Sequence, residues 1–180
     1  MNKKHIITSV VAIVASALVL FICAGTLSKM AEENAQKELN AMMATLLPDS
    51  TSFVAEEFDA TVHTGLKAVY KGETGFIIES SAYGYAGDIT LLVAVNNDGS
   101  VNGLVVRDLS ETYGLGARAL TDTAFLEQFL GTSGEAEVGN NVDALTGATV
   151  SSKAVTKAVN SAVAYVTGAD VSSSATEWGG

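Results

Sequence analysis

The chain has 180 residues, 48% of them hydrophobic, and a formal net charge of −10. This length fits one domain of modest size with additional segments. The acidic balance argues against nucleic acid as a partner, because nucleic-acid binding depends on basic surfaces. One cysteine and two histidines are too few for an internal disulfide, a thiolate metal site or a histidine cage for zinc or haem. His63, in a strand-like segment, is predicted to be a surface residue.

Residues 6–27 form an uncharged block, IITSVVAIVASALVLFICAGTL. As a helix this block is about 33 Å long, enough to cross a hydrocarbon core of about 30 Å. The block therefore predicts a single-pass protein of the cell membrane, and Lys3 and Lys4, which precede it, set the orientation by the positive-inside rule. Its N-terminus would be cytoplasmic and its main domain extracytoplasmic. That main part has a net charge of −12, because all 20 acidic residues but only eight of the ten Lys and Arg follow the block. Such a charge disfavours adsorption to anionic lipid, so the transmembrane helix alone is expected to hold the domain at the membrane.

Two other interpretations of this block remain open. A cleaved signal peptide also begins with basic residues, but its apolar core is normally about 7 to 15 residues long. A lipoprotein would use Cys23, yet the bulky Phe21 and Ile22 stand where a small residue is expected. The length of the block favours an uncleaved anchor, predicted over residues 1–28 together with the cytoplasmic N-terminus.

The next segment, residues 29–50, has the pattern of a helix. Ser28 is a candidate N-cap, acidic residues occupy the first turns, and Ala, Leu and Met recur at helical spacing. Pro48, the only proline of the chain, stands where such a helix should have ended. This helix is interpreted as a stalk that continues from the membrane, with a peripheral core helix as the alternative.

Residues 51–168 are predicted to form an α+β domain with an antiparallel sheet and flanking helices. Its strands are expected in the runs FVAEEF, GLKAVYK and TGFIIESSAYGY. Two further apolar runs flank NNDGS, which predicts a hairpin with Asn97, Asp98 and Gly99 at its tip.

Two helices follow the predicted strands. The first, in TDTAFLEQFLG, would begin at Thr121 or Asp122 and end at Gly131. Four apolar residues are expected on one of its faces. They are Phe125, Leu126, Phe129 and Leu130. The second, in SSKAVTKAVNSAVAYVTG, would be capped by Ser151 or Ser152, end near Gly168 and bury an Ala/Val stripe against the sheet. Residues 169–180 are predicted to be a flexible tail.

The loop SETYGLGARAL, residues 110–120, is a candidate ligand-binding segment. Gly114 and Gly116 allow the backbone to approach a flat ligand. Glu111 and Thr112 offer hydrogen-bonding groups, and Leu115 offers apolar surface. The alternative is a wide turn between a strand and a helix.

A second candidate is DALTGATVSSKAV, Asp143–Val155. Gly147 and Ala148 are small, so another group can come close to Thr149, and a helix N-terminus favours a phosphate. The segment lacks the glycine pattern of a Walker loop, and its only lysine is Lys153. A phosphoester on a threonine hydroxyl would remove the need for a tight phosphate cradle. The alternative is an ordinary helix cap.

The run D-A-L-T-G-A-T, Asp143–Thr149, resembles the flavinylation signature of membrane-anchored FMN-binding domains. In that family a flavin transferase joins FMN through its phosphate to the last threonine of the run. The resemblance implies Thr149 as the acceptor, with Ser151 as a second hydroxyl nearby and Asp143 as the acid that often precedes the motif.

The order of segments from about residue 72 to residue 168 is similar to the G subunit of Rnf-type electron-transport complexes. The resemblance implies an electron-transfer subunit that is not catalytic alone, in a membrane complex coupling ferredoxin and NAD to Na⁺ or H⁺ movement. Tyr113 departs from the family, which usually has proline there. The implied FMN-binding residues lie in the two candidate segments. They are Thr146, Gly147, Ala148, Thr149, Ser151, Ser152 and Lys153 around the phosphate, and Glu111, Thr112, Gly114, Leu115 and Gly116 beside the ring.

Three alternative functions remain open. The C subunit of the Na⁺-translocating NADH:quinone oxidoreductase has a similar flavin motif, but the short spacing here favours the Rnf-type subunit. A stand-alone extracytoplasmic flavin carrier would use the same motif. A membrane-anchored binding or assembly module without redox chemistry would use the hydroxyl run only as a helix cap.

Overall fold

The computed structural model describes Ser16, Leu27 and residues 29–109 and 122–169, which fall into two compact units, Met1–Met42 and Met43–Gly180. Residues 29–46 are helical, which confirms the helix predicted in this region, and Pro48 follows its end. Within the described residues, no helix is long and apolar enough to cross a membrane. The predicted anchor, apart from Ser16 and Leu27, lies outside the described residues.

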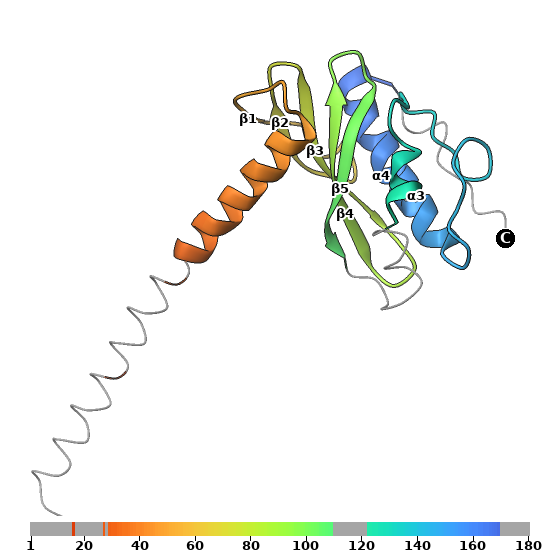
Figure 1. Cartoon of the computed structure of the whole chain (residues 1–180), viewed down its shortest axis with the longest axis horizontal. Helices are drawn as coiled ribbons and strands as arrows, with labels where there is room; N and C mark the ends of the chain where they lie inside the picture. Colours follow the sequence, from red (N-terminus) through yellow and green to blue (C-terminus); the bar gives the residue numbers. More distant parts are fainter. Residues whose placement is uncertain (1–15, 17–26, 28, 110–121, 170–180) are drawn as a thin grey trace, which may run out of the picture. The chain divides into compact units, whose positions relative to one another are not determined.

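Five antiparallel strands form one sheet in the order β1-β2-β3-β4-β5, as predicted for an α+β domain (Figure 1). They are β1 (Val54–Glu56), β2 (Leu66–Lys71), β3 (Gly75–Tyr83), β4 (Asp88–Asn96) and β5 (Val101–Leu109). The predicted hairpin joins β4 to β5. Asn96 donates a backbone hydrogen bond to the Ser100 carbonyl over 2.8 Å, and Gly99 has the positive φ of 87° that the turn requires.

Helices α3 (Thr123–Glu127) and α4 (Thr149–Thr167) lie on the same side of the sheet (Figure 1). The Asp122 side chain caps α3 by accepting from the Phe125 N–H, which confirms one of the two predicted caps. At the other end of the domain, α4 ends at Gly168 in the left-handed conformation, as predicted.

The main core lies between α4 and the sheet. Val155, Val159 and other small apolar residues of α4 pack against Ile78, Leu91 and Val93, all fully buried. The buried Ser80 hydroxyl donates a hydrogen bond of 2.9 Å to the carbonyl of Ala158 and so joins β3 to the middle of α4. Burial of this Ala/Val stripe confirms the amphipathic helix predicted from its spacing.

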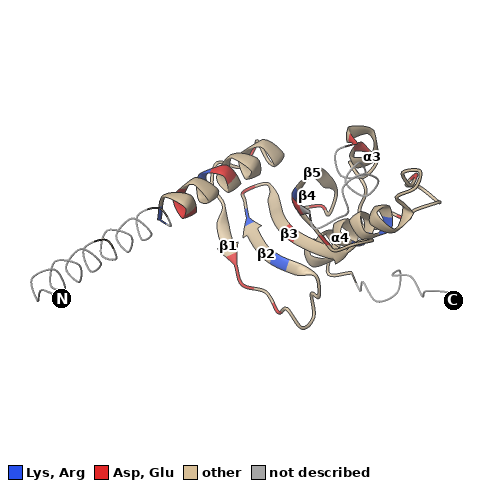
Figure 2. Ribbon diagram, turned by 90° about the horizontal axis from the view of Figure 1, so that it is seen from below, with Lys and Arg blue, Asp and Glu red and all other residues tan. Residues whose placement is uncertain are grey.

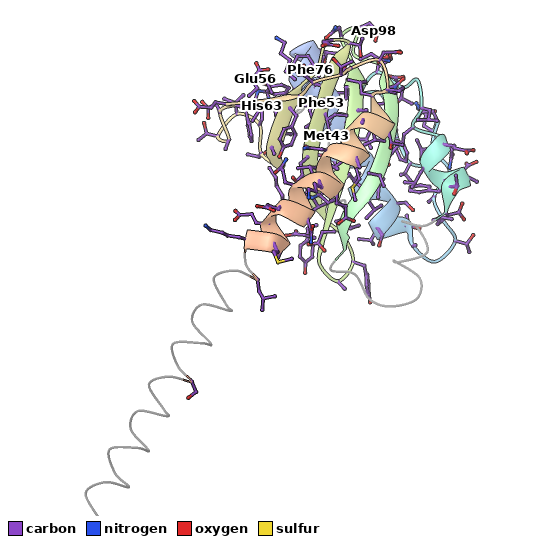
Figure 3. All side chains as sticks on the ribbon, turned by 60° about the vertical axis from the view of Figure 1, so that its left-hand side comes forward. Met43, Phe53, Glu56, His63, Phe76 and Asp98 are labelled. Carbon is purple, nitrogen blue, oxygen red and sulfur yellow. The ribbon has the colours of Figure 1, made fainter. Side chains whose placement is uncertain are left out.

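Residues 43–47 cover the opposite face of the sheet (Figure 3). Met43 and Leu47 are buried. Leu46 lies close to β5, because a Cβ added to Gly103 would be only 3.1 Å from a methyl group of the Leu46 side chain. Asn102 on β5 donates a hydrogen bond of 2.8 Å from its amide to the Leu46 carbonyl. The sheet therefore has helical residues on both faces.

Two side-chain environments refine the predictions. Of the four apolar residues expected on one face around α3, Phe125 and Phe129 are buried, Leu126 is half-buried against the core and Leu130 is exposed. His63 lies in a turn rather than a strand, and its ring packs edge-on against Tyr165 at 5.0 Å. The tyrosine ring makes His63 half-buried, so it is not simply a surface residue.

Candidate functional site

The chain makes a tight turn just before α4. The Ala148 N–H donates to the Leu145 carbonyl over 2.9 Å, and Gly147, at the third position of this turn, has a φ of 80°. A positive φ at this position is typical of a type II turn and favours glycine. The small residues of the Thr-Gly-Ala run therefore serve the backbone of this turn.

Thr149 is the first residue of α4, and its side chain is exposed. The N-cap, Ala148, provides no side-chain hydrogen bond to the helix end. The first N–H groups of a helix have no intrahelical acceptor, and the helix dipole places partial positive charge there. The Thr149 hydroxyl is thus accessible at a helix end suited to an anion.

The two serines that follow are buried and do not cap the helix, so the predicted serine cap is wrong. Ser151 is 1% exposed and Ser152 is fully buried. The Ser152 hydroxyl donates to the Ala148 carbonyl over 2.9 Å and accepts from the Leu145 N–H over 3.2 Å. Because the N-cap is Ala148, three or four residues before the predicted Ser151 or Ser152, these hydroxyls lie inside the first turn rather than at its end.

Burial also separates the two hydroxyls considered as acceptors of a covalent group. A transferase must reach the oxygen that it modifies, and Thr149 is exposed while Ser151 is buried. Lys153, exposed on the same helix, is the basic residue nearest to Thr149 along the chain. Thr149 therefore has the access that a modified residue needs.

Gln128, the C-cap residue of α3, holds the beginning of the motif. Its side-chain oxygen accepts from the Asp143 N–H over 2.7 Å, and its side-chain nitrogen donates to the Asp143 carbonyl over 3.3 Å. Both backbone groups of Asp143 are thus paired by one amide side chain. This contact fixes the start of the motif against α3.

The motif lies at the end of the sheet opposite the β4–β5 hairpin. Thr167, at the C-terminal end of α4, lies beside this hairpin. A Cβ added to Gly99 would be only 2.5 Å from the methyl group of Thr167. With 19 residues α4 is about 28 Å long, similar to a nine-residue strand at about 30 Å. Its N-terminus with Thr149 is therefore at the end where β3 turns into β4. Asp98, at the hairpin tip, marks the opposite end in Figure 3.

The glycine-containing loop connects two elements next to the motif. It follows Leu109, which pairs with Ile89 at the same end of the sheet, and it is followed by Asp122, the cap of α3. Its five predicted ligand-binding residues lie outside the described residues. They are Glu111, Thr112, Gly114, Leu115 and Gly116. The contact between Gln128 and Asp143 then links the helix that follows this loop to the motif.

The groove of the domain lies away from the motif. An open groove of about 430 Å³ is lined by residues of β1, β2 and the segment after β1, including Glu56, Lys67 and Tyr70, and shares no residue with the motif. The described part of the chain holds no group of His, Cys, Asp and Glu that could bind a metal. Acidic residues are spread over the described ribbon, and basic ones are fewer (Figure 2).

Neither Gln128 nor the structural use of Ser152 was predicted from the sequence. The one signal in the sequence was an amide side chain in the otherwise apolar and acidic run FLEQFLG, between the two phenylalanines that anchor α3. For Ser152, the helix start had to be known before its hydroxyl could be placed inside the first turn.

Comparison with known proteins gives one consistent result. Residues 84–164, which include β4, β5, α3 and the motif, match the FMN-binding domain. The chain is 30% identical, over 87% of its length, to the G subunit of the Na⁺-translocating ferredoxin:NAD⁺ oxidoreductase complex of Acetobacterium woodii, 86% of which is covered. The G subunit of the proton-translocating ferredoxin:NAD⁺ oxidoreductase complex of Clostridium ljungdahlii is 37% identical over 74% of this chain and 76% of the relative. The G subunit of the ion-translocating oxidoreductase complex of Methanosarcina acetivorans is 34% identical over 91% of this chain and 93% of the relative. The chain belongs to the family of G subunits of ion-translocating oxidoreductase complexes, the Rnf-type complexes.

Proposed function

We propose that this chain is the FMN-carrying, electron-transfer subunit of an ion-translocating ferredoxin:NAD⁺ oxidoreductase complex, with FMN joined through its phosphate to Thr149. The family match supports the cofactor and the complex. The observation that carries the attachment site is the exposed Thr149 hydroxyl at the uncapped start of α4. The other hydroxyls of the first turn are buried.

The residues present fit a phosphodiester at this position. A phosphodiester keeps one negative charge, which the positive end of the dipole of a 19-residue helix would stabilise. Lys153 would add a second positive charge. Thr146, Gly147 and Ala148 form the turn that keeps the phosphate side of Thr149 open, while Ser151 and Ser152 lie behind it as packing groups.

FMN, when bound, supplies chemistry with one or two electrons, and the protein holds and orients the ring. We assign the orientation of the flavin ring to five residues of the glycine-containing loop, Glu111, Thr112, Gly114, Leu115 and Gly116. The loop that contains them joins β5, which ends beside the β3–β4 hairpin, to α3, which holds the motif through Gln128. Both ends of this loop thus lie on elements of the motif end of the domain.

Covalent attachment has a physical purpose in the proposed location. The proposal places the domain outside the cytoplasm, behind a single transmembrane helix at residues 1–28, and requires a flavin transferase for maturation. A dissociated FMN would be diluted there, whereas a covalent bond keeps its local concentration high. Among the relatives, one is named Na⁺-translocating and another proton-translocating.

The competing interpretation is a binding or assembly module whose hydroxyl run only caps a helix. The observed helix start does not support it. The N-cap is Ala148 and has no side-chain bond to the helix end. Since the residue at the cap position has no hydroxyl, the run does not supply the cap that this alternative assigned to it.

Replacement of one hydroxyl tests the attachment site. When the full chain is produced together with a flavin transferase, we expect its intact mass to increase by one FMN less one water. Thr149→Ala should show only the polypeptide mass and no flavin absorbance. Thr123→Ala, which removes an exposed hydroxyl outside the motif, should still carry FMN. A flavin adduct on Thr149→Ala, or none on the unaltered chain, would refute the proposal.

A further inference from the structure

We propose that Gln128 is a positioning residue that sets the motif in the conformation in which FMN is attached to Thr149. This inference depends on the proposed function. It assigns a role to a residue outside both candidate segments, through its contacts with Asp143.

The contact between Gln128 and Asp143 is specific in both directions. An amide side chain has an acceptor and a donor on one planar group, and here each pairs with the complementary backbone group of Asp143. Two parallel bonds define an orientation as well as a distance. The chain therefore enters the motif in one direction relative to α3.

The support for Gln128 is fixed by the core. Phe125 and Phe129, on either side of it, are buried, and their rings pack edge-to-face with centroids 5.4 Å apart. The Asp122 side chain holds the first turn of the same short helix. These three side chains fix α3 relative to the core. Gln128, at the end of this helix, therefore holds Asp143 in a fixed position relative to the core.

A second contact holds the motif two residues further on. The buried hydroxyl of Ser152 accepts from the Leu145 N–H, at the start of the turn that ends with Ala148. Gln128 and Ser152 together fix both sides of Ala144, and the turn then leads directly to Thr149. Without Gln128, Asp143 loses both of these bonds, while the bond from the Leu145 N–H to Ser152 remains.

The attachment step requires a defined position of the Thr149 hydroxyl. The Thr149 oxygen forms a bond to the flavin-side phosphorus of a flavin dinucleotide donor, and the phosphoric anhydride bond breaks. A nucleoside monophosphate leaves, and the hydroxyl proton is released to solvent. The nucleophile must stand within about 3–3.5 Å of phosphorus and in line with the leaving group, and a displacement of about 1 Å can lower such a rate by about 10²-fold. The transferase then acts on the folded motif rather than on an extended segment.

The experiment measures the rate of FMN incorporation by intact mass, using the purified full chain, the transferase and a flavin dinucleotide. We expect Gln128→Ala to lower the rate about tenfold or more. Gln128→Glu retains an acceptor for the Asp143 N–H but loses the donor to its carbonyl, so its rate should be intermediate. Melting temperatures are measured in parallel.

Asn102→Ala is the matched control, because it removes the hydrogen bond from an amide side chain on β5 to the Leu46 backbone carbonyl without touching the motif. It should leave the rate unchanged. A wild-type rate for Gln128→Ala, or equal slowing of Gln128→Ala and Asn102→Ala, would overturn the inference. If Gln128→Ala does not fold, Gln128→Glu decides: an unchanged rate overturns the inference and a reduced rate with an unchanged melting temperature supports it. Failure of the unaltered chain to take up FMN would instead refute the proposed function, and this inference with it.

Discussion

The two ends of the sheet both contain a glycine turn, but different interactions hold them. At the β4–β5 hairpin, the Asp98 carboxylate accepts from the N–H and hydroxyl of Ser100, two residues away. At the motif, a backbone bond from Ala148 to Leu145 closes the turn at Gly147, and Gln128 and Ser152 hold the residues before it from 15 and seven residues away. The side-chain contacts of the Asp98 carboxylate at the hairpin are local, although Asn97 is also bonded to the Thr74 carbonyl, whereas the start of the motif is held by side chains from outside the turn.

This difference fits the roles of the two ends. A hairpin turn only has to reverse the chain, and its own residues are sufficient for that. The motif has to present one hydroxyl in a defined place at a helix end, so it needs supports that belong to the core. Mutations at the two ends should therefore have different consequences.

The largest change in stability is expected for Ser152→Ala at the motif end. The half-buried Leu145 N–H would lose its acceptor, which costs about 1–3 kcal/mol of the free energy of unfolding. Thr156→Val is the control, because the Thr156 hydroxyl bonds only to the Ser152 carbonyl of its own helix and should cost less than about 1 kcal/mol. Urea denaturation measures both. Equal losses would mean that the bond to Leu145 adds nothing.

A smaller effect is expected for Gly99→Ala at the hairpin end. Its φ of 87° costs an L-residue about 1–2 kcal/mol, and the added Cβ would lie 2.5 Å from the Thr167 methyl group, which must move. Gly131→Ala has a similar φ of 77° but no described atom within 4 Å of the new Cβ. The difference between the two melting temperatures isolates the contact with α4. FMN attachment should be unaffected in both variants, and a slower attachment in Gly99→Ala would show that the two ends are coupled through α4.

The smallest effect is the pH dependence of the hairpin. The Ser100 hydroxyl, followed by the Ser100 N–H, lowers the pKa of Asp98 below its ordinary value. A lowered pKa in the folded state stabilises the protein above the unfolded-state pKa of about 3.9, and this contribution is lost as the pH falls through the folded value. The difference in urea midpoint between the unaltered chain and Ser100→Ala should thus be constant near neutral pH and shrink below about pH 4. A difference that does not change with pH would exclude the carboxylate as its source.

Much of the fold was predictable because its signals are local. Alternating β-rich runs, the NNDGS turn, the Asp122 cap and the Ala/Val spacing of α4 all lie within a few residues of the features that they specify. The wrong prediction about the helices concerns the cap of α4. Helix boundaries depend on where neighbouring segments hold the chain, and the turn at Gly147 moved the start of α4 ahead of the serines.

The sequence by itself determined the family and, as a hypothesis, the acceptor threonine, because these depend on residue identity and on short spacing. Only the tertiary structure decided which hydroxyl is exposed. Thr149 and Ser151 are chemically similar and two residues apart, yet the packing of α4 against the sheet buries one and leaves the other accessible. The tertiary structure also brought Gln128 to Asp143, because the buried phenylalanines place α3 beside a segment that is distant in the chain.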